Sequence, residues 1–209
     1  MKMKHIYKRY ILSCLLVLAS YATLAGDVRA EDARDLIKKT AEGVIAHVKI
    51  NRLAMEEDPA QLYAMVNEKL APHVDFQRMS RWILGKHWRK ASDDQKSQFT
   101  DEFKKLMIKT YATALLKLSD EEISYPPIKG ETRNGKVSIK SEIVTPDGRR
   151  FTVLYRMHHK DQSWKIYDIS VDGVSLISTY RSSFATEIRQ VGLDGLLDNL
   201  ENKNEGVNI

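Results

Sequence analysis

The apolar residues of this 209-residue chain change their spacing near Asp120, and this change limits the folds open to the chain. Before Asp120 they recur at three- and four-residue steps, which is the period of amphipathic helices. From about Ile123 to Val171 they alternate with polar residues, which is the period of β-strands. From Ser175 the helical spacing returns. Helices, then strands, then helices again predict an α+β fold.

The helical part before Asp120 divides into four predicted segments. Helices are expected over residues 31–56, where Ile37, Ala41 and Val44 share a face, from Asp58 to about Leu70, and over 75–90. The fourth begins at Ser92, which has the capping-box spacing with Gln95. Its apolar stripe consists of Phe99, Phe103, Leu106, Met107, Thr110, Tyr111, Ala114, Leu115 and Leu118. Such a stripe predicts a long helix that lies against a broad apolar surface.

The alternating part is punctuated by turn signals. Asn134-Gly135 is typical of a hairpin turn between residues 123–129 and 136–144, and Lys160–Ser163 marks a later turn. The pattern predicts an antiparallel β-meander of about four strands. We expect helices to wrap this sheet in a cone-like, nuclear-transport-factor-like fold with an internal apolar cavity. The last helices are expected over 175–191 and 193–202, with residues 203–209 as a frayed tail.

The first 30 residues have the order of a secretory signal peptide. Basic residues precede an apolar run from Ile11 to Leu18, and small residues follow at Ala25 and Ala30. The run is too short to span a bilayer. We therefore expect secretion, cleavage after Ala30 (or after Ala25), and a single domain over residues 31–209.

Removal of this segment changes the charge and the cysteine content. It holds five of the 33 basic and one of the 28 acidic residues, so the mature chain has a net charge near +1 instead of +5. That value removes the electrostatic argument for nucleic-acid binding. The single cysteine, Cys14, lies in the segment, which excludes disulfides, cysteine-ligated zinc and cysteine nucleophiles from the mature protein.

Few residues suggest catalysis. Ser175 follows Gly173, but Ile177 stands where a nucleophile elbow needs a second glycine, so Ser175 is predicted to be a helix N-cap. His158 and His159 are adjacent in a strand and point to opposite faces, and no metal site is predicted. Asp168 and Tyr155 are the one pair that an enzyme could use. The alternative, which we favour, is that Tyr155 packs and Asp168 pairs with a surface base.

Three stretches resemble the MlaC / toluene-tolerance family of periplasmic phospholipid-binding proteins, which belong to a lipid-asymmetry pathway. They read MSRWILGKHWRKASDDQKSQF (79–99), EFKKLMIKTYATALL (102–116) and DGVSLISTYRSSFATEIRQVGLDGLLDNL (172–200). The most specific block is Gly-Val-Ser-Leu at 173–176, followed by Tyr180, Arg181 and Phe184. The resemblance covers nearly the whole mature chain in the same order.

The resemblance implies a periplasmic carrier without catalytic residues or cofactors, whose cargo is a phospholipid. Implied partners are an outer-membrane lipoprotein–porin complex and the MCE-domain component of an inner-membrane ABC transporter. Arg181 would lie at the head-group rim. The implied apolar cavity is lined by Phe103, Leu106, Met107, Tyr111, Ala114, Leu115, Val137, Ile139, Phe151, Val153, Tyr155, Ile177 and Tyr180. Two alternatives remain: a cone-fold enzyme of isomerase or dehydratase type acting on a small apolar substrate, and a module that binds only protein.

Overall fold

The computed structural model describes residues 29–128, 132–207 and 209. The predicted signal peptide, apart from Arg29 and Ala30, lies outside the described residues. The helices are α2 (Ala30–Glu57), α3 (Pro59–Lys69), α4 (Phe76–Leu84), α5 (Asp93–Lys117) and α6 (Leu176–Asn204), with short 3-10 turns η2 (Ala71–His73) and η3 (Leu118–Asp120). The strands are β1 (Glu122–Ser124), β2 (Lys136–Val144), β3 (Arg150–Lys160), β4 (Ser163–Val171) and β5 (Val174–Ser175).

The strands form one antiparallel meander in the order β1-β2-β3-β4-β5. The predicted α+β class is confirmed, with five strands rather than about four, because the short β5 adds to the edge of β4. The first strand is shorter than predicted and ends before Pro126, which has no amide hydrogen to donate to a neighbour. Asn134 and Gly135 have φ values of 51° and 65°, which the predicted hairpin turn requires.

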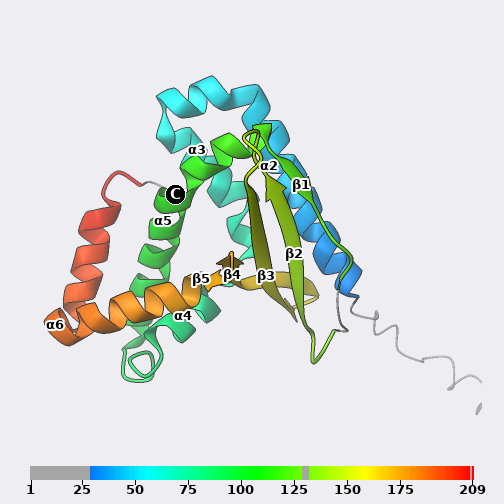
Figure 1. The fold of residues 1–209 in the computed structure, drawn as a ribbon. Coiled ribbons are helices and arrows are strands. Elements are labelled where there is room, and N and C mark those ends of the chain that lie inside the picture. Colours follow the sequence, from blue (N-terminus) through cyan, green and yellow to red (C-terminus); the bar gives the residue numbers. More distant parts are fainter. Residues whose placement is uncertain (1–28, 129–131, 208) are drawn as a thin grey trace, which may run out of the picture.

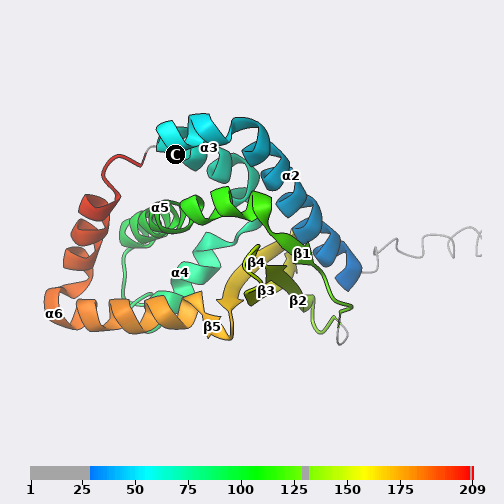
Figure 2. The same cartoon turned by 45° about the horizontal axis from the view of Figure 1, so that its top comes forward.

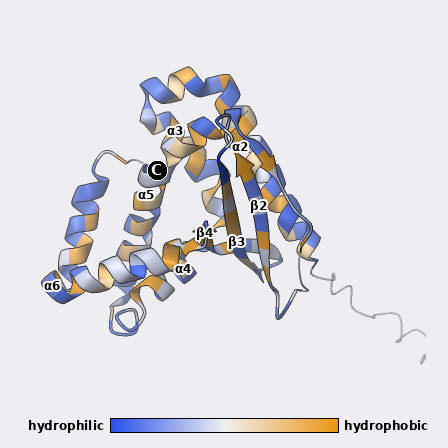
Figure 3. Ribbon diagram, viewed as in Figure 1, coloured by the Kyte–Doolittle hydropathy of each residue, from blue (hydrophilic) through white to orange (hydrophobic). Residues whose placement is uncertain are grey.

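Helices lie along the sheet and beyond one end of it. In Figures 1 and 2, α2 runs beside the strands, and α4, α5 and α6 form a second group next to β4 and β5. Polar residues alternate with apolar ones along these helices (Figure 3), as expected for elements that cover a core on one side and meet water on the other.

Three groups of buried residues hold these layers together. One joins α4, α5 and both parts of α6 and includes Phe99, Phe103 and Phe184. A second joins α2, α3 and α5, and a third joins the start of α2 to the sheet. Helix α5 therefore has more than the one apolar face predicted. Ile108 and Ala112, which lie off the predicted stripe, are buried against α2 and α3.

Two helix ends differ from the prediction. Helix α4 ends at Leu84, six residues before its predicted end, because Gly85 has φ 54° and ψ −114°. Residues 203–207, the described start of the predicted frayed tail, are packed, so the prediction was wrong for them. Asn204 and Val207 are buried, and the Asn204 amide donates to the Glu102 carboxylate and carbonyl at 2.7 and 2.8 Å. The predicted break in α6 is confirmed at Gly192, where φ is 77° and ψ is 179°.

Candidate functional site

A cavity of about 340 Å³ lies where the three buried groups meet. Its walls come from α2, α3, η2, α4, α5, the first residue of η3, strands β2 to β4 and the first residue of α6. Tyr111 and Val171 line it and are nevertheless 40% and 41% exposed. The cavity therefore reaches solvent beside these two residues, while its remaining walls are formed by the packed layers.

The cavity lining carries no charge. Of its 25 side chains, 21 are Ala, Val, Leu, Ile, Met or Phe, and the other four are Thr40, His73, Tyr111 and Tyr155. A buried charge without a partner is costly, so this lining disfavours a charged group deep in the cavity. Apolar walls with few polar groups are typical of sites for apolar ligands.

Five of the predicted site residues meet in this cavity. Met107, Tyr111 and Leu115 reach it from α5, and Val153 and Tyr155 reach it from β3. The spacing of four residues along α5 and of two along β3 places each set on one face of its element. Both periods read from the sequence therefore point into one enclosed space.

Other predicted site residues lie in close-packed core instead of the cavity. Phe103, Leu106 and Ile177 are buried between α4, α5 and α6, with Tyr180 packed against them. Val137 and Ile139 are buried between the sheet and α2. They share a face with cavity residues, but a neighbouring helix covers them.

Three predicted site residues lie away from both the cavity and these cores. Ala114 is exposed on α5. Phe151 lies near the β2–β3 turn, where the Arg149 guanidinium is 5.8 Å from its ring centre. Arg181 is not at the cavity rim: its guanidinium lies against Gly85, at the junction of α4 and α6. Arg181 therefore belongs to a helix contact and does not face a cavity-bound ligand.

The sequence did not predict that the helical wall opposite the sheet lines the cavity. It includes Ala41 of α2, Val66 of α3 and Phe76 of α4. The apolar spacing of α2 was visible in the sequence. Spacing reports which side of a helix is covered, and it does not distinguish a covering side chain from an unfilled space.

Tyr155 and His73, two polar side chains of the cavity lining, have shifted pKa values. Burial raises the pKa of Tyr155, whose hydroxyl accepts a hydrogen bond from Ser141 Oγ at 3.5 Å. Burial, and then the nearby Lys165 charge, lower the pKa of His73 below 6.5. Burial likewise lowers the pKa of His158 outside the cavity, with a further lowering by the Arg78 charge. Both imidazoles are therefore neutral at pH 7.

The protein is expected to lose stability as the pH falls below 6.5. Unfolded His73 and His158 bind protons near that pH, whereas the folded protein binds them only at lower pH, so protonation favours the unfolded chain. Urea unfolding at about pH 7.5 and about pH 5 measures this loss. His73→Gln should reduce it, while His47→Gln serves as the control. An equal loss in both variants would contradict the assignment to His73.

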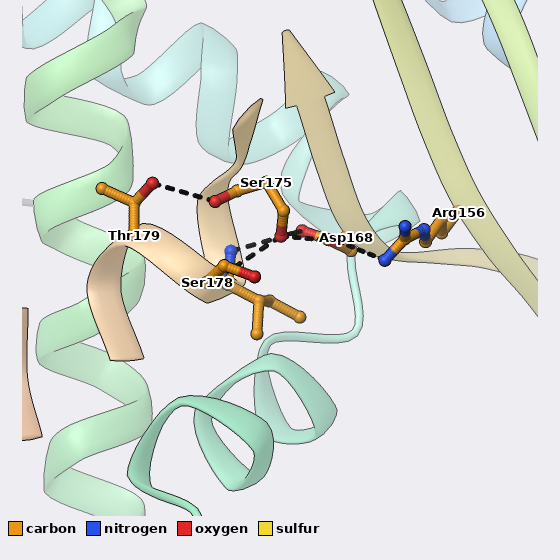
Figure 4. A network of polar contacts seen from close by, with 6 residues as sticks. Arg156, Asp168, Ser175, Ser178 and Thr179 are labelled. Carbon is orange, nitrogen blue, oxygen red and sulfur yellow. Dashed lines mark hydrogen bonds and ion pairs between the residues drawn. The ribbon is translucent and has the colours of Figure 1, made fainter. Parts of the chain in front are cut away.

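A hydrogen-bond network fixes the join between the sheet and α6 (Figure 4). Asp168, which is only 1% exposed, accepts from Ser175 Oγ at 2.8 and 3.0 Å and from the Ile177 amide at 3.3 Å. Arg156 Nη1 donates to the same carboxylate at 3.2 Å. Ser175 Oγ also accepts from the Ser178 amide at 3.2 Å, which confirms Ser175 as the N-cap of α6.

This network also shows that Asp168 and Tyr155, the pair that an enzyme could use, do not face the same space. Tyr155 lines the cavity, but Asp168 does not, and the Asp168 oxygens are occupied by Ser175, Ile177 and Arg156. Asp168 thus pairs with a partly exposed base, as favoured from the sequence. The two side chains cannot act on one substrate in the cavity.

Among the described residues no group of three or more His, Cys, Asp or Glu side chains is placed to hold a metal ion. His158 contacts Asp75, whereas His159 packs on Trp164, so the two rings face different neighbours, as predicted. Within the described part of the chain, no helix combines the length and apolar character needed to cross a membrane.

The fold and cavity define an α+β protein with an internal site suited to an apolar ligand. A family model described as "MlaC protein" matches residues 38–202. The chain therefore belongs to the MlaC protein family. Its relatives include toluene tolerance protein ttg2D of Pseudomonas putida, 27% identical over 86% of this chain and 83% of that protein. Another is the intermembrane phospholipid transport system binding protein MlaC of Haemophilus influenzae, 23% identical over 93% and 92%.

A solved structure is also similar. It is the phospholipid-binding protein from Ralstonia solanacearum in complex with a phospholipid, with a TM-score of 0.76 and 29% identity. The match covers 83% of this chain and 97% of that one. These relatives are named for binding, transport or tolerance and not for catalysis, in agreement with the prediction that the protein is not an enzyme.

Proposed function

We propose that this protein is a periplasmic phospholipid carrier. The observation that carries the proposal is the uncharged cavity of about 340 Å³, in a fold similar to that of a phospholipid-bound relative. The acyl tails would occupy the cavity, and the head group would stay near Tyr111 and Val171, where the cavity reaches solvent. No cofactor is required for such a role.

The energetics of lipid transfer explain why a carrier is needed. Two chains of about sixteen carbons, at ~0.8 kcal/mol for each CH₂ group, cost on the order of 25 kcal/mol in water. The cavity volume is at the lower end of the roughly 300–1,000 Å³ of ligand sites. We infer that the walls move apart, or the tails project past the opening, when a diacyl lipid is bound.

The proposed route has one donor and one acceptor membrane. The carrier would exchange lipid with an outer-membrane lipoprotein–porin complex and with the MCE-domain component of an inner-membrane ABC transporter. Nucleotide hydrolysis would belong to the transporter, since this chain needs only a cavity and docking contacts. The uncharged lining supports this division of roles, because it provides apolar burial for lipid tails.

Native mass spectrometry tests the lipid-binding step. The full chain, expressed in a bacterium and purified from the periplasm without detergent, should carry an added mass near that of a phospholipid. After denaturation the intact mass should correspond to a start at Glu31 (or Gly26), without acylation of Cys14. A bound small metabolite, or a chain that never carries lipid, would refute the carrier function. Transfer of a fluorescent phospholipid between vesicles then tests shuttling.

A further inference from the structure

A second cleft, of about 520 Å³, lies on the side of α4 that faces away from the apolar cavity. It shares no residue with the cavity lining, and its lining is charged, whereas that of the cavity is not. Arg78, Arg81 and Lys160 supply three positive charges, and Asp75 is the one acidic residue in its lining. Trp82 and Trp88 add two aromatic side chains to its walls.

The single carboxylate of the cleft is already occupied. Asp75 Oδ1 accepts from the Arg78 amide at 2.9 Å, as the N-cap of α4. Asp75 Oδ2 accepts from His158 Nε2 at 2.9 Å, with Lys160 Nζ at 3.9 Å. The cleft therefore keeps a net positive charge that its own residues do not neutralise.

The Arg78 guanidinium is held in place before any ligand arrives. Its Cζ lies 5.1 Å from the Trp82 ring centre and 4.8 Å from that of Tyr167, at cation–π distance. Its Nη1 donates to His158 Nδ1 at 3.3 Å, which requires a neutral imidazole with its proton on Nε2, directed at Asp75. A side chain fixed in this way loses little conformational freedom on binding.

Among the described residues, His158 Nδ1 is the one hydrogen-bond acceptor of this guanidinium, and its Nε is left without one. Arg78 Nε is buried and has no hydrogen-bond partner, which is unusual because buried polar groups are nearly always paired. Among the described residues, neither Arg78 nor Arg81 has a carboxylate within ion-pair distance. Two guanidinium groups about one helical turn apart therefore carry positive charge that no carboxylate of the described residues neutralises.

We propose that this cleft docks an acidic side chain of a protein partner. The Arg78 fork suits a carboxylate, with which arginine forms two parallel hydrogen bonds. Trp82 is 37% exposed at the same place, and arginine and tryptophan are the residues that dominate the binding energy of protein interfaces. Tyr111 and Val171, beside which the cavity reaches solvent, are not part of this cleft, and the proposal holds whether or not the cavity carries phospholipid.

Titration with a hexaglutamate peptide at low salt, followed by tryptophan fluorescence and calorimetry, tests this proposal. Arg78→Lys keeps the charge and removes the fork, so binding should weaken about tenfold. Arg81→Gln should also weaken it severalfold. This exposed side chain makes no ion pair among the described residues, so the variant should melt as the wild type does. Arg150→Gln, the same loss of charge on β3, should bind the peptide as the wild type does.

Three results would overturn the proposal. Equal binding by the Arg81→Gln and Arg150→Gln variants would mean that the affinity for the peptide depends only on the net charge of the protein. Binding of inorganic phosphate as tightly as the peptide would assign the cleft to a small anion. Arginine-dependent binding to phosphatidylglycerol vesicles, without binding to the peptide, would assign it to a membrane surface. None of these depends on lipid in the cavity, so failure here is distinguishable from failure of the carrier function.

Discussion

Ala41→Trp is expected to reduce the phospholipid bound per mole of protein by about tenfold or more, which corresponds to a loss of at least about 1.4 kcal/mol in binding. Ala41 lies on α2, is only partly buried and lines the cavity. An indole at this position would extend into the space proposed for the acyl tails. Because Ala41 borders a cavity and not close-packed side chains, the delipidated variant should melt close to the wild type.

The matched control is Ala46→Trp. Ala46 is exposed on the same helix, so this variant has the same change in helix propensity and side-chain size without filling the cavity. Its lipid content and melting temperature should remain those of the wild type. The measurements are lipid extraction per mole and thermal melting of delipidated protein. If Ala41→Trp kept its lipid and lost stability, Ala41 would lie in close-packed core, where overpacking typically costs about 1–3 kcal/mol.

Asp168→Ala is expected to lower the free energy of unfolding by about 2–4 kcal/mol, since each buried donor left unpaired costs about 1–3 kcal/mol. The change removes the acceptor of the Ser175 hydroxyl and of the Ile177 amide at the start of α6. Arg156 adds little to this loss because its side chain is 45% exposed, and exposed ion pairs are weak.

Two further variants separate the parts of the Asp168 network. Ser175→Ala should cost about 1 kcal/mol, the usual value of an N-cap, because Asp168 keeps Arg156 and the Ile177 amide. Asp198→Ala, at an exposed position on α6, should change stability by no more than about 0.5 kcal/mol. Denaturant unfolding measures all three variants. A cost for Asp168→Ala as small as that for Asp198→Ala would show that the network does not hold the sheet to α6.

Much of the fold was determined by the sequence itself, because local spacing and turn chemistry act over a few residues. The change of period at Asp120 separated helices from strands, and Asn134-Gly135 placed a hairpin turn correctly. Ser92 capped the long helix as predicted, and Gly192 divided the last one. Each of these features depends on residues that are close together in the chain, so it could be predicted without knowledge of distant contacts.

Only the tertiary structure decided which apolar residues line a cavity and which fill a core. Met107 and Leu106 are adjacent on α5, yet Met107 faces the cavity, whereas Leu106 packs against α4 and α6. Both lie on the predicted stripe, but successive residues point about 100° apart around a helix, so the two side chains meet different neighbours. The spacing does not show whether those neighbours leave a space. The partners of Asp168 and Arg78 come from other elements for the same reason. Periodicity records that a side chain is covered, and the relative placement of whole helices and strands determines what covers it.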